Sequence, residues 1–299
     1  MATPLVTIIT PTYNRAGFLR ETVESVLSQD YPAIEYIVLD DGSNDNTAEI
    51  MAAYGEKVKY IYHGNMGETA TVNKGFAMSG GDIVCVINSD DPFYTNQAVS
   101  TAVRYLNEHA DAVMAYPDWV AIDETGAVLH KEQLPQYTFE SMLKGARVCI
   151  GPGMFIRRST IQAIGPRNAD LKYVGDLDYS FRMASKGKIV HIPHYLATHR
   201  THKGSLSSSA KGKRMAHEVA GLGMGYVDGA ELPEGLNRSR KNLAAKWYFI
   251  AIPFAGRDYK AAFELYKRAM KSSFVETMRL SATFIIKKII RAFSLIFRR

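Results

Sequence analysis

The chain has only two cysteines in 299 residues, Cys85 and Cys149, and both lie in apolar segments without metal-type spacing. A disulfide framework and a cysteine-based zinc site are therefore not expected, and such isolated thiols are typical of a reducing compartment. No apolar run reaches the ~18 residues of a membrane span. The first residues lack the basic stretch and apolar core of a signal peptide. We therefore expect a globular chain in the cytoplasm.

Three common functional motifs are also absent. No G-x-G-x-x-G follows the first predicted strand, and no G-x-x-x-x-G-K-[ST] occurs anywhere. Dinucleotide-binding and P-loop proteins are therefore disfavoured. No predicted helix carries two histidines one turn apart, so the zinc-protease motif is absent too.

Acidic residues are scarce in the C-terminal part of the chain. From residue 238 to residue 299 there are 15 Lys and Arg but only 3 Asp and Glu, so this segment carries +12 and the preceding residues about −6. A basic segment on an acidic body predicts an anionic partner. Over about 280–299, Ile286, Ile289 and Phe293 form an apolar stripe opposite the basic residues. This is typical of a helix at an anionic membrane surface, although a helix packed on the body or a dimer contact would share the pattern.

Short apolar runs alternate with helical repeats over the first hundred residues. Strands are predicted near 5–10, 34–39, 57–62 and 83–87, with helices between them. This alternation predicts an α/β fold with a doubly wound, mostly parallel sheet. From Lys241 onward the sequence is predominantly helical, so we expect a C-terminal helical extension.

Polar residues follow three of the predicted strands. They are Thr12 and Tyr13 after the first strand, Asp41 after the second, and the run 88–91 (Asn-Ser-Asp-Asp) after the fourth. The carboxyl ends of parallel strands meet at one edge, where open α/β sheets bind ligands. A tyrosine can stack on a base, a carboxylate can accept hydrogen bonds from a base or ribose, and adjacent carboxylates favour a divalent cation. The alternative for the acidic run is a turn, because Asp-Asp-Pro is also common in turns.

Two further segments carry candidate site residues. Asp176 and Asp178 begin a predicted helix, where Asp176 could equally be a helix cap. The segment His199–His202 is polar and follows a short predicted strand. Histidines in such loops are more often solvated than bound to a metal.

Together these segments closely resemble glycosyltransferase family 2. The resemblance covers about residues 4–207 and depends on motifs in this order: Thr10–Arg15, Asp40–Ser43, Gly67 with Asn73 and Gly75, Gly81–Asp82, Asn88–Asp91 and Asp176–Asp178 with Arg182. It implies a GT-A fold with a Rossmann-like nucleotide-binding half and an acceptor half. It assigns 1–210 to the catalytic domain and leaves 211–299 as a helical region with a basic amphipathic tail.

The resemblance also implies roles for individual residues. Asp176 is expected to be the catalytic base that deprotonates the acceptor. Asp90 and His202 are expected to bind Mn²⁺ or Mg²⁺. Nucleotide binding is expected of Pro11, Thr12, Tyr13, Asp41, Lys74, Asn88 and Ser89. Supporting roles are expected of Asp91, Asp178 and Arg200, with Asp178 either the alternative base or a structural partner of Arg182.

Three residues depart from the family pattern. Asn88 stands where many members have an acidic residue, so it can bind ribose but adds no charge. Gly175 replaces the usual acidic residue before Asp176. Val72 replaces an arginine, and Lys74 is near enough in sequence to substitute for it.

The predicted function is inverting transfer of a sugar from a nucleotide diphosphate, with UDP favoured, to a hydroxyl of a glycan or lipid-linked acceptor. The predicted setting is cell-surface polysaccharide or lipopolysaccharide synthesis at the inner face of the membrane, without a nucleic-acid partner. One alternative is transfer to a polyprenyl phosphate, which needs no strong base. The other is a nucleotide-sugar-binding scaffold without activity, which only Asn88 and Gly175 favour.

Overall fold

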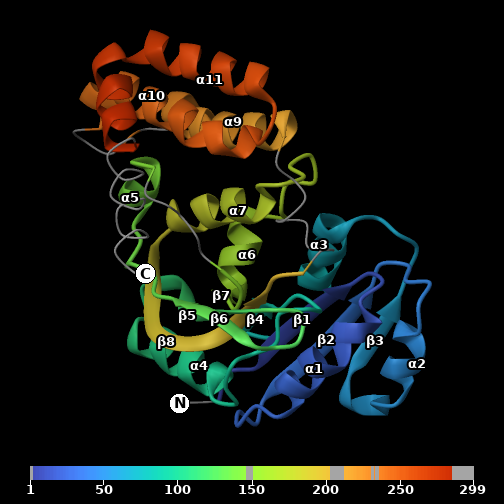
Figure 1. Cartoon of the computed structure of the whole chain (residues 1–299). Helices are drawn as coiled ribbons and strands as arrows, with labels where there is room; N and C mark the ends of the chain where they lie inside the picture. Colours follow the sequence, from blue (N-terminus) through green and yellow to red (C-terminus); the bar gives the residue numbers. More distant parts are fainter. Residues whose placement is uncertain (1–2, 146–150, 203–211, 230–231, 233–235, 285–299) are drawn as a thin grey trace, which may run out of the picture. The chain divides into compact units, whose positions relative to one another are not determined.

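The computed structural model describes residues 3–145, 151–202, 212–229, 232 and 236–284 (Figure 1). The chain divides into two compact units. The first contains 1–139, 148–170 and 175–205, and the second contains 140–147, 171–174 and 206–299. Each unit is described separately.

The first unit is built on one sheet with the strand order β3-β2-β1-β4-β7-β5-β6, in which β8 also pairs with β5. Four strands run parallel, namely β1 (Val6–Thr12), β2 (Ile34–Asp40), β3 (Lys59–Tyr62) and β4 (Ile83–Val86). The remaining strands are β5 (Ala112–Ile122), β6 (Val128–Glu132), β7 (Phe155–Arg157) and β8 (Lys188–Arg200). Strand β8 is parallel to β5, whereas β6 and β7 are antiparallel to it.

Helices lie on both faces of this sheet (Figure 1). One face packs against α1 (Ala16–Leu27) and α4 (Ala98–Glu108), and the opposite face against α3 (Glu68–Met78) and α7 (Gly175–Ala184). Two shorter helices are α2 (Thr47–Ala52) and α6 (Arg158–Ile164). The predicted α/β fold with a mostly parallel sheet is therefore confirmed.

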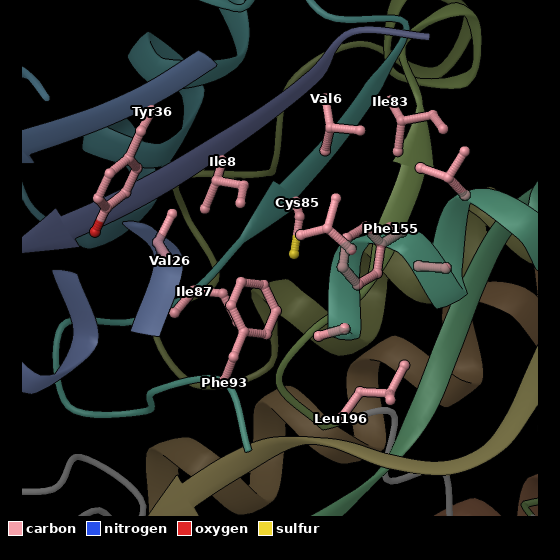
Figure 2. Packing of buried hydrophobic residues seen from close by; sticks show 14 of the residues in the cluster. Val6, Ile8, Val26, Tyr36, Ile83, Cys85, Ile87, Phe93, Phe155 and Leu196 are labelled. Atoms are coloured by element: carbon pink, nitrogen blue, oxygen red, sulfur yellow. The ribbon is translucent and has the colours of Figure 1, made fainter. Parts of the chain in front are cut away.

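The main core lies between the sheet and the α1/α4 layer. Figure 2 shows Cys85 of β4 directed toward this core, with Phe93 and Phe155 beside it. The two phenylalanine rings stack with centroids 6.1 Å apart. Burial raises the pKa of the Cys85 thiol, so this cysteine is a packing residue.

Two strands extend further than the sequence predicts. The predicted strand over 5–10 continues through Pro11 to Thr12, because β4 pairs with β1 only from Val6 to Ile9 and Pro11 lies beyond those pairs. The final strand does not end at Pro193 but continues to Arg200, with register shifts along β5 that accommodate the irregular backbone. This extension carries the chain back to the end of β4, where Thr198 N–H donates to Pro92 O at 3.1 Å.

The second unit is helical, as predicted. It contains α9 (Lys213–Gly229), α10 (Arg240–Ala251) and α11 (Tyr259–Ser272), together with residues 140–143 of α5 (Phe139–Leu143). The helices pack closely, since a Cβ on Gly223 would lie 1.9 Å from the Trp247 ring. Residues 274–284 are helical, and the rest of the predicted basic tail lies outside the described residues. Among the described helices, none is both long and apolar enough to cross a membrane.

Candidate functional site

The ends of β1 and β2 form the first part of the site. Asp41 N–H donates to Thr12 O at 2.9 Å, so the predicted residues of the two strands are direct neighbours. Asn14 adopts a left-handed backbone with φ of 52°, and its side-chain oxygen accepts a hydrogen bond from Asn44 N–H at 2.8 Å. This turn leaves the Tyr13 side chain 46% exposed, and its ring is therefore open to a ligand.

The two aspartates after β2 hold different segments. Asp40 is buried and accepts hydrogen bonds from the Tyr60 hydroxyl at 2.6 Å and from Ser43 N–H at 2.8 Å. Asp41 accepts one hydrogen bond on each carboxylate oxygen, from Met66 N–H at 2.6 Å and from Gly67 N–H at 2.9 Å. Because Gly67 is the N-cap of α3, Asp41 fixes where this helix begins.

The predicted acidic run after β4 is tied to the end of β8. Asp91 is 3% exposed and accepts hydrogen bonds from Arg200 N–H at 2.7 Å and from the Asn88 side chain at 3.1 Å. It also lies 3.6 Å from Nδ1 of His199 and raises the pKa of that histidine. Asp91 and Asn88 thus shape the loop, and the turn interpretation is correct for this part of the run.

Asp90 and His202 come together although they are 112 positions apart, with Asp90 Oδ2 2.8 Å from His202 Nε2. The Arg15 side chain approaches the same oxygen at 3.6 Å. A carboxylate oxygen and an imidazole nitrogen that converge in this way fit a site for Mn²⁺ or Mg²⁺ whose remaining ligands come from phosphate and water. Within the described residues no group of three or more potential metal-binding side chains occurs.

Arg200 connects the Asp90 backbone to residues of other segments. Its side chain is almost fully buried, with Nε donating to Asp90 O at 2.9 Å, one terminal nitrogen to Asp123 O at 3.0 Å, and the other paired with Glu21. The guanidinium also lies over the Phe18 ring at 5.1 Å. These donors are used inside the protein, so Arg200 positions Asp90.

The two aspartates of α7 have different surroundings. Asp176 is exposed in the first turn of the helix, and its Oδ1 accepts a hydrogen bond from Leu177 N–H at 2.7 Å. Asp178 forms an ion pair with Arg182 Nε at 3.0 Å, and Arg182 also donates to Ile164 O at 2.9 Å. Asp178 is therefore a structural partner of Arg182, whereas Asp176 is accessible to a substrate.

The other predicted nucleotide-binding residues have simpler environments. Pro11 lies within β1, and Ser89 is buried with its carbonyl accepting a hydrogen bond from the Thr22 hydroxyl at 2.9 Å. Lys74 lies on α3, half-buried, and its ammonium has no hydrogen bond or ion pair with the described residues.

Sequence analysis assigned no individual role to four charged or titratable residues of this region: Arg15, Glu68, Arg167 and His199. Arg15 could have been found from its motif, Thr10–Arg15, since it directly follows the turn after β1. Arg167 and Glu68 had no sequence signal, because their importance comes from what surrounds them in the fold.

Comparisons with known proteins show the family of the chain. Residues 7–165 match the family described as Glycosyl transferase family 2, so the chain belongs to this family and is a glycosyltransferase. An uncharacterized glycosyltransferase of Rickettsia prowazekii is 31% identical over 69% of this chain and 67% of its own length. Another from Rickettsia typhi is 29% identical over 72% of this chain and 70% of its own length.

Two solved structures share the fold. One is S. aureus TarS 1–349 in complex with UDP-GlcNAc, with a TM-score of 0.70 and 18% identity over 90% of this chain and 81% of that one. The other is a mannosyltransferase from Pyrobaculum calidifontis in complex with GDP-Man and Mn²⁺, with a TM-score of 0.62 and 15% identity over 97% of this chain and 81% of that one. The predicted GT-A fold is therefore confirmed.

Proposed function

We propose that this glycosyltransferase moves a sugar from a nucleotide diphosphate, with UDP the favoured nucleotide, to a hydroxyl of a glycan or lipid-linked acceptor with inversion. The observation that carries the proposal is the convergence of Asp90 and His202 at the carboxyl edge of the sheet, the edge at which the exposed Tyr13 follows β1. The TarS complex contains UDP-GlcNAc, which supports a UDP-sugar here. The catalytic domain is proposed to span 1–210.

Donor binding is assigned to the ends of β1, β2 and β4. Tyr13 stacks on the base. Asp41 accepts a hydrogen bond from a base N–H, because each of its carboxylate oxygens accepts only one backbone N–H, from residue 66 or 67, and keeps a further lone pair. Asn88 donates or accepts hydrogen bonds at the ribose. Lys74 adds a positive charge for the phosphates, and Pro11, Thr12 and Ser89 shape the pocket.

The metal is proposed to be Mn²⁺ or Mg²⁺ held by Asp90 and His202. Such an ion neutralises the charge that develops on the departing diphosphate. The Pyrobaculum structure, which contains GDP-Man and Mn²⁺, supports this assignment. Arg15, 3.6 Å from Asp90, keeps this carboxylate oriented and adds positive charge beside the phosphates.

Asp176 is proposed to remove the proton from the acceptor hydroxyl as the oxygen attacks the anomeric carbon. Its exposure in the first turn of α7 leaves one carboxylate oxygen open, while the other accepts the Leu177 N–H. Attack from the side opposite the diphosphate inverts the anomeric centre in one step and needs no protein nucleophile. Family membership argues against the scaffold alternative.

The first test is a thermal-shift panel of UDP, GDP, UDP-sugars and GDP-mannose, each with and without Mn²⁺, on the wild type and on Asp90→Ala. Ligand binding to the folded state raises the melting temperature. We expect a metal-dependent increase with one nucleotide class that Asp90→Ala loses and the surface control Asp111→Ala keeps. If no nucleotide shifts the wild type with metal present, the proposed function is wrong.

The second unit is proposed to attach the protein peripherally to the inner face of the cell membrane. One face of α11 presents exposed Tyr259 and Phe263, which are 80% and 61% exposed, and exposed Lys260, Lys267 and Lys271. Aromatic and basic residues on one helix face bind anionic lipid surfaces. The sequence of the basic tail over about 280–299 also combines aromatic and basic residues. A lipid-linked acceptor in surface polysaccharide or lipopolysaccharide synthesis would meet the site there.

A further inference from the structure

Two charged side chains near the proposed catalytic groups have no hydrogen bond or ion pair with any described residue. Arg167, between α6 and α7, is only 8% exposed, and its Nε–H is buried without an acceptor. Glu68, the first residue of α3, is exposed. A buried guanidinium without hydrogen-bond acceptors costs folding free energy. A site that keeps one is therefore expected to gain a partner when a ligand binds.

Arg167 is held in place by contacts that do not use its guanidinium donors. Its backbone N–H donates to Asn73 Oδ1 at 2.8 Å, and Asn73 Nδ2 donates back to its carbonyl at 2.9 Å. The guanidinium lies over the rings of Phe76 and Tyr179, at 5.8 and 5.7 Å from the centroids. The side chain is therefore held by contacts that leave its guanidinium without a hydrogen bond to any described residue.

Glu68 lies where the first turns of α3 and α7 approach each other. A Cβ on Gly175 would lie 3.9 Å from Thr69 Oγ1, so Gly175 and the proposed base next to it adjoin the start of α3. Surrounding protein desolvates the Glu68 carboxylate and raises its pKa. The charge of Arg167 opposes this increase, whereas the charges of Asp176, Asp90 and Asp91 add to it. Glu68 thus interacts electrostatically with both ends of the proposed reaction site.

We propose that Glu68 and Arg167 bind the ring hydroxyls of the sugar that is transferred. The inference rests on the proposed function, in which the diphosphate lies at Asp90 and the acceptor oxygen at Asp176. The anomeric carbon of the donor sugar is bonded to the diphosphate and is attacked by the acceptor oxygen. The donor sugar therefore has to lie between Asp90 and Asp176. A carboxylate accepts hydrogen bonds from sugar hydroxyls, and a guanidinium donates two in a fixed fork.

The charges at this subsite also select the kind of sugar. A neutral sugar can satisfy Glu68 and Arg167 together without adding charge. The carboxylate of a uronic acid would gain Arg167 but would face Glu68, Asp90 and Asp176 as well. Neutral hexoses and N-acetylhexosamines are therefore the expected substrates, and Glu68 is the residue that rejects acidic sugars.

The test is calorimetric titration with Mn²⁺, without an acceptor, on full-length wild type, Glu68→Gln, Arg167→Met and the control Glu49→Gln. Glu49 also lies in the first turn of a helix but is exposed on α2. The probes are UDP, UDP-glucose, UDP-GlcNAc, UDP-glucuronic acid, GDP and GDP-mannose. Omitting the acceptor makes the measurement specific for the donor sugar.

We expect both subsite variants to bind the neutral nucleotide sugar at least about 10-fold more weakly, because hydrogen bonds to charged groups contribute about 1.5–3 kcal/mol. Their affinity for the matching nucleoside diphosphate should stay within about twofold. Glu68→Gln should also narrow the preference for UDP-glucose over UDP-glucuronic acid. Glu49→Gln should match the wild type throughout.

Other outcomes separate the two levels of the proposal. If the variants lower the affinity for the nucleotide and for the nucleotide sugar equally, or change neither affinity, the proposed sugar subsite is wrong. The proposed function stands in both cases. If the wild type binds no nucleotide or nucleotide sugar, both fail. Arg167→Met should fold, because Asn73 contacts only the backbone of residue 167 and an apolar side chain removes the unpaired charge. Its melting temperature, measured in parallel, checks this directly.

Discussion

Asp176 and Asp178 are two residues apart on α7 and have different chemistry available to them. Asp178 is already neutralised by Arg182, whereas Asp176 is exposed. Removing a general base typically lowers turnover about 10²–10⁴-fold. Asp176→Asn should therefore lose turnover on that scale and keep its affinity for the donor, as measured by initial rates and by titration.

Asp178→Asn is the matched control for this substitution. It should retain most turnover and lose about 1 kcal/mol of stability with its ion pair. Near-normal turnover in Asp176→Asn would instead favour transfer to a polyprenyl phosphate, whose oxygen is already ionised and needs no base.

Arg200 joins Asp90, Asp123 and Glu21 through one planar group, which a lysine cannot reproduce. Arg200→Lys should therefore cost about 2–4 kcal/mol and lower the melting temperature by about 5–10 °C. The control is Arg104→Lys, whose partner Glu108 is exposed, and it should change stability by less than about 0.5 kcal/mol. Equal melting temperatures for the two variants would show that the Arg200 network contributes nothing.

The protonation of Glu68 makes the folding stability of the protein depend on pH. Its folded pKa lies above its unfolded value, so the ionised carboxylate is disfavoured in the native state. The wild type should therefore gain stability relative to Glu68→Gln as the pH falls from neutral toward the usual glutamate range. Urea unfolding at a series of pH values measures this, and a difference that is constant with pH would contradict it.

Positions at strand ends were predictable at the residue scale, but the partners of the side chains were not. Asp41 and Asp90 were found because acidic residues follow apolar runs. Nothing in the sequence shows that Asp41 accepts hydrogen bonds from the start of α3, or that the Arg167 guanidinium has no hydrogen bond to any described residue. Both depend on where segments distant in sequence meet, which local patterns do not encode.

At the scale of elements, the close packing of α3 on the sheet restricts position 75 of this helix to glycine. A Cβ there would lie 2.7 Å from Ile9 and 2.9 Å from Leu39, so α3 packs directly on β1 and β2 through this glycine. Gly75→Ala should displace the helix and cost about 1–3 kcal/mol. Because α3 carries Glu68 and Asn73, donor binding should weaken as well.

Gly17→Ala is the matched control on α1, since no atom lies within 4 Å of its added Cβ. It should leave donor binding unchanged and raise stability by up to about 1 kcal/mol, because alanine favours helices over glycine. Denaturant unfolding distinguishes the two variants. A stable, fully active Gly75→Ala would show that α3 has room to move on the sheet.

The alternating strands and helices of the first hundred residues were predicted well, because their apolar periods are regular. Helix α9 falls in the region 211–299 that was predicted to be helical, but its bounds were not predicted, since its 17 residues include four glycines that lower helix propensity. Packing explains the helix: Gly223 lies against the Trp247 ring, where a larger residue would not fit. Tertiary contact outweighs local preference in this segment.

For the whole molecule, the basic charge of the C-terminal part predicts binding to anionic membranes. The double substitution Tyr259→Ser/Phe263→Ser, and separately deletion of residues 285–299, should each reduce binding to vesicles that contain phosphatidylglycerol. Binding should also fall as salt is raised, because salt screens the attraction of lysines to the lipid. Co-sedimentation measures both effects.

The control for this experiment is Tyr62→Ser, which removes a tyrosine that is 59% exposed in the first unit. Equal binding to vesicles of phosphatidylcholine alone would contradict the electrostatic part of the proposal. If the variants change the oligomeric state measured by light scattering and leave vesicle binding intact, the helix face is a dimer contact.

The contact between Asp90 and His202 has a consequence during protein synthesis. A ribosome that has released the first 140 residues has already produced β1 to β4, with Asp41 and Asp90, but neither Arg200 nor His202. At about 5–20 residues per second, those two residues follow only several seconds later. On the proposed assignment, a nascent chain can pair β1 to β4 and still lack the pair that holds the metal, because His202 follows β8.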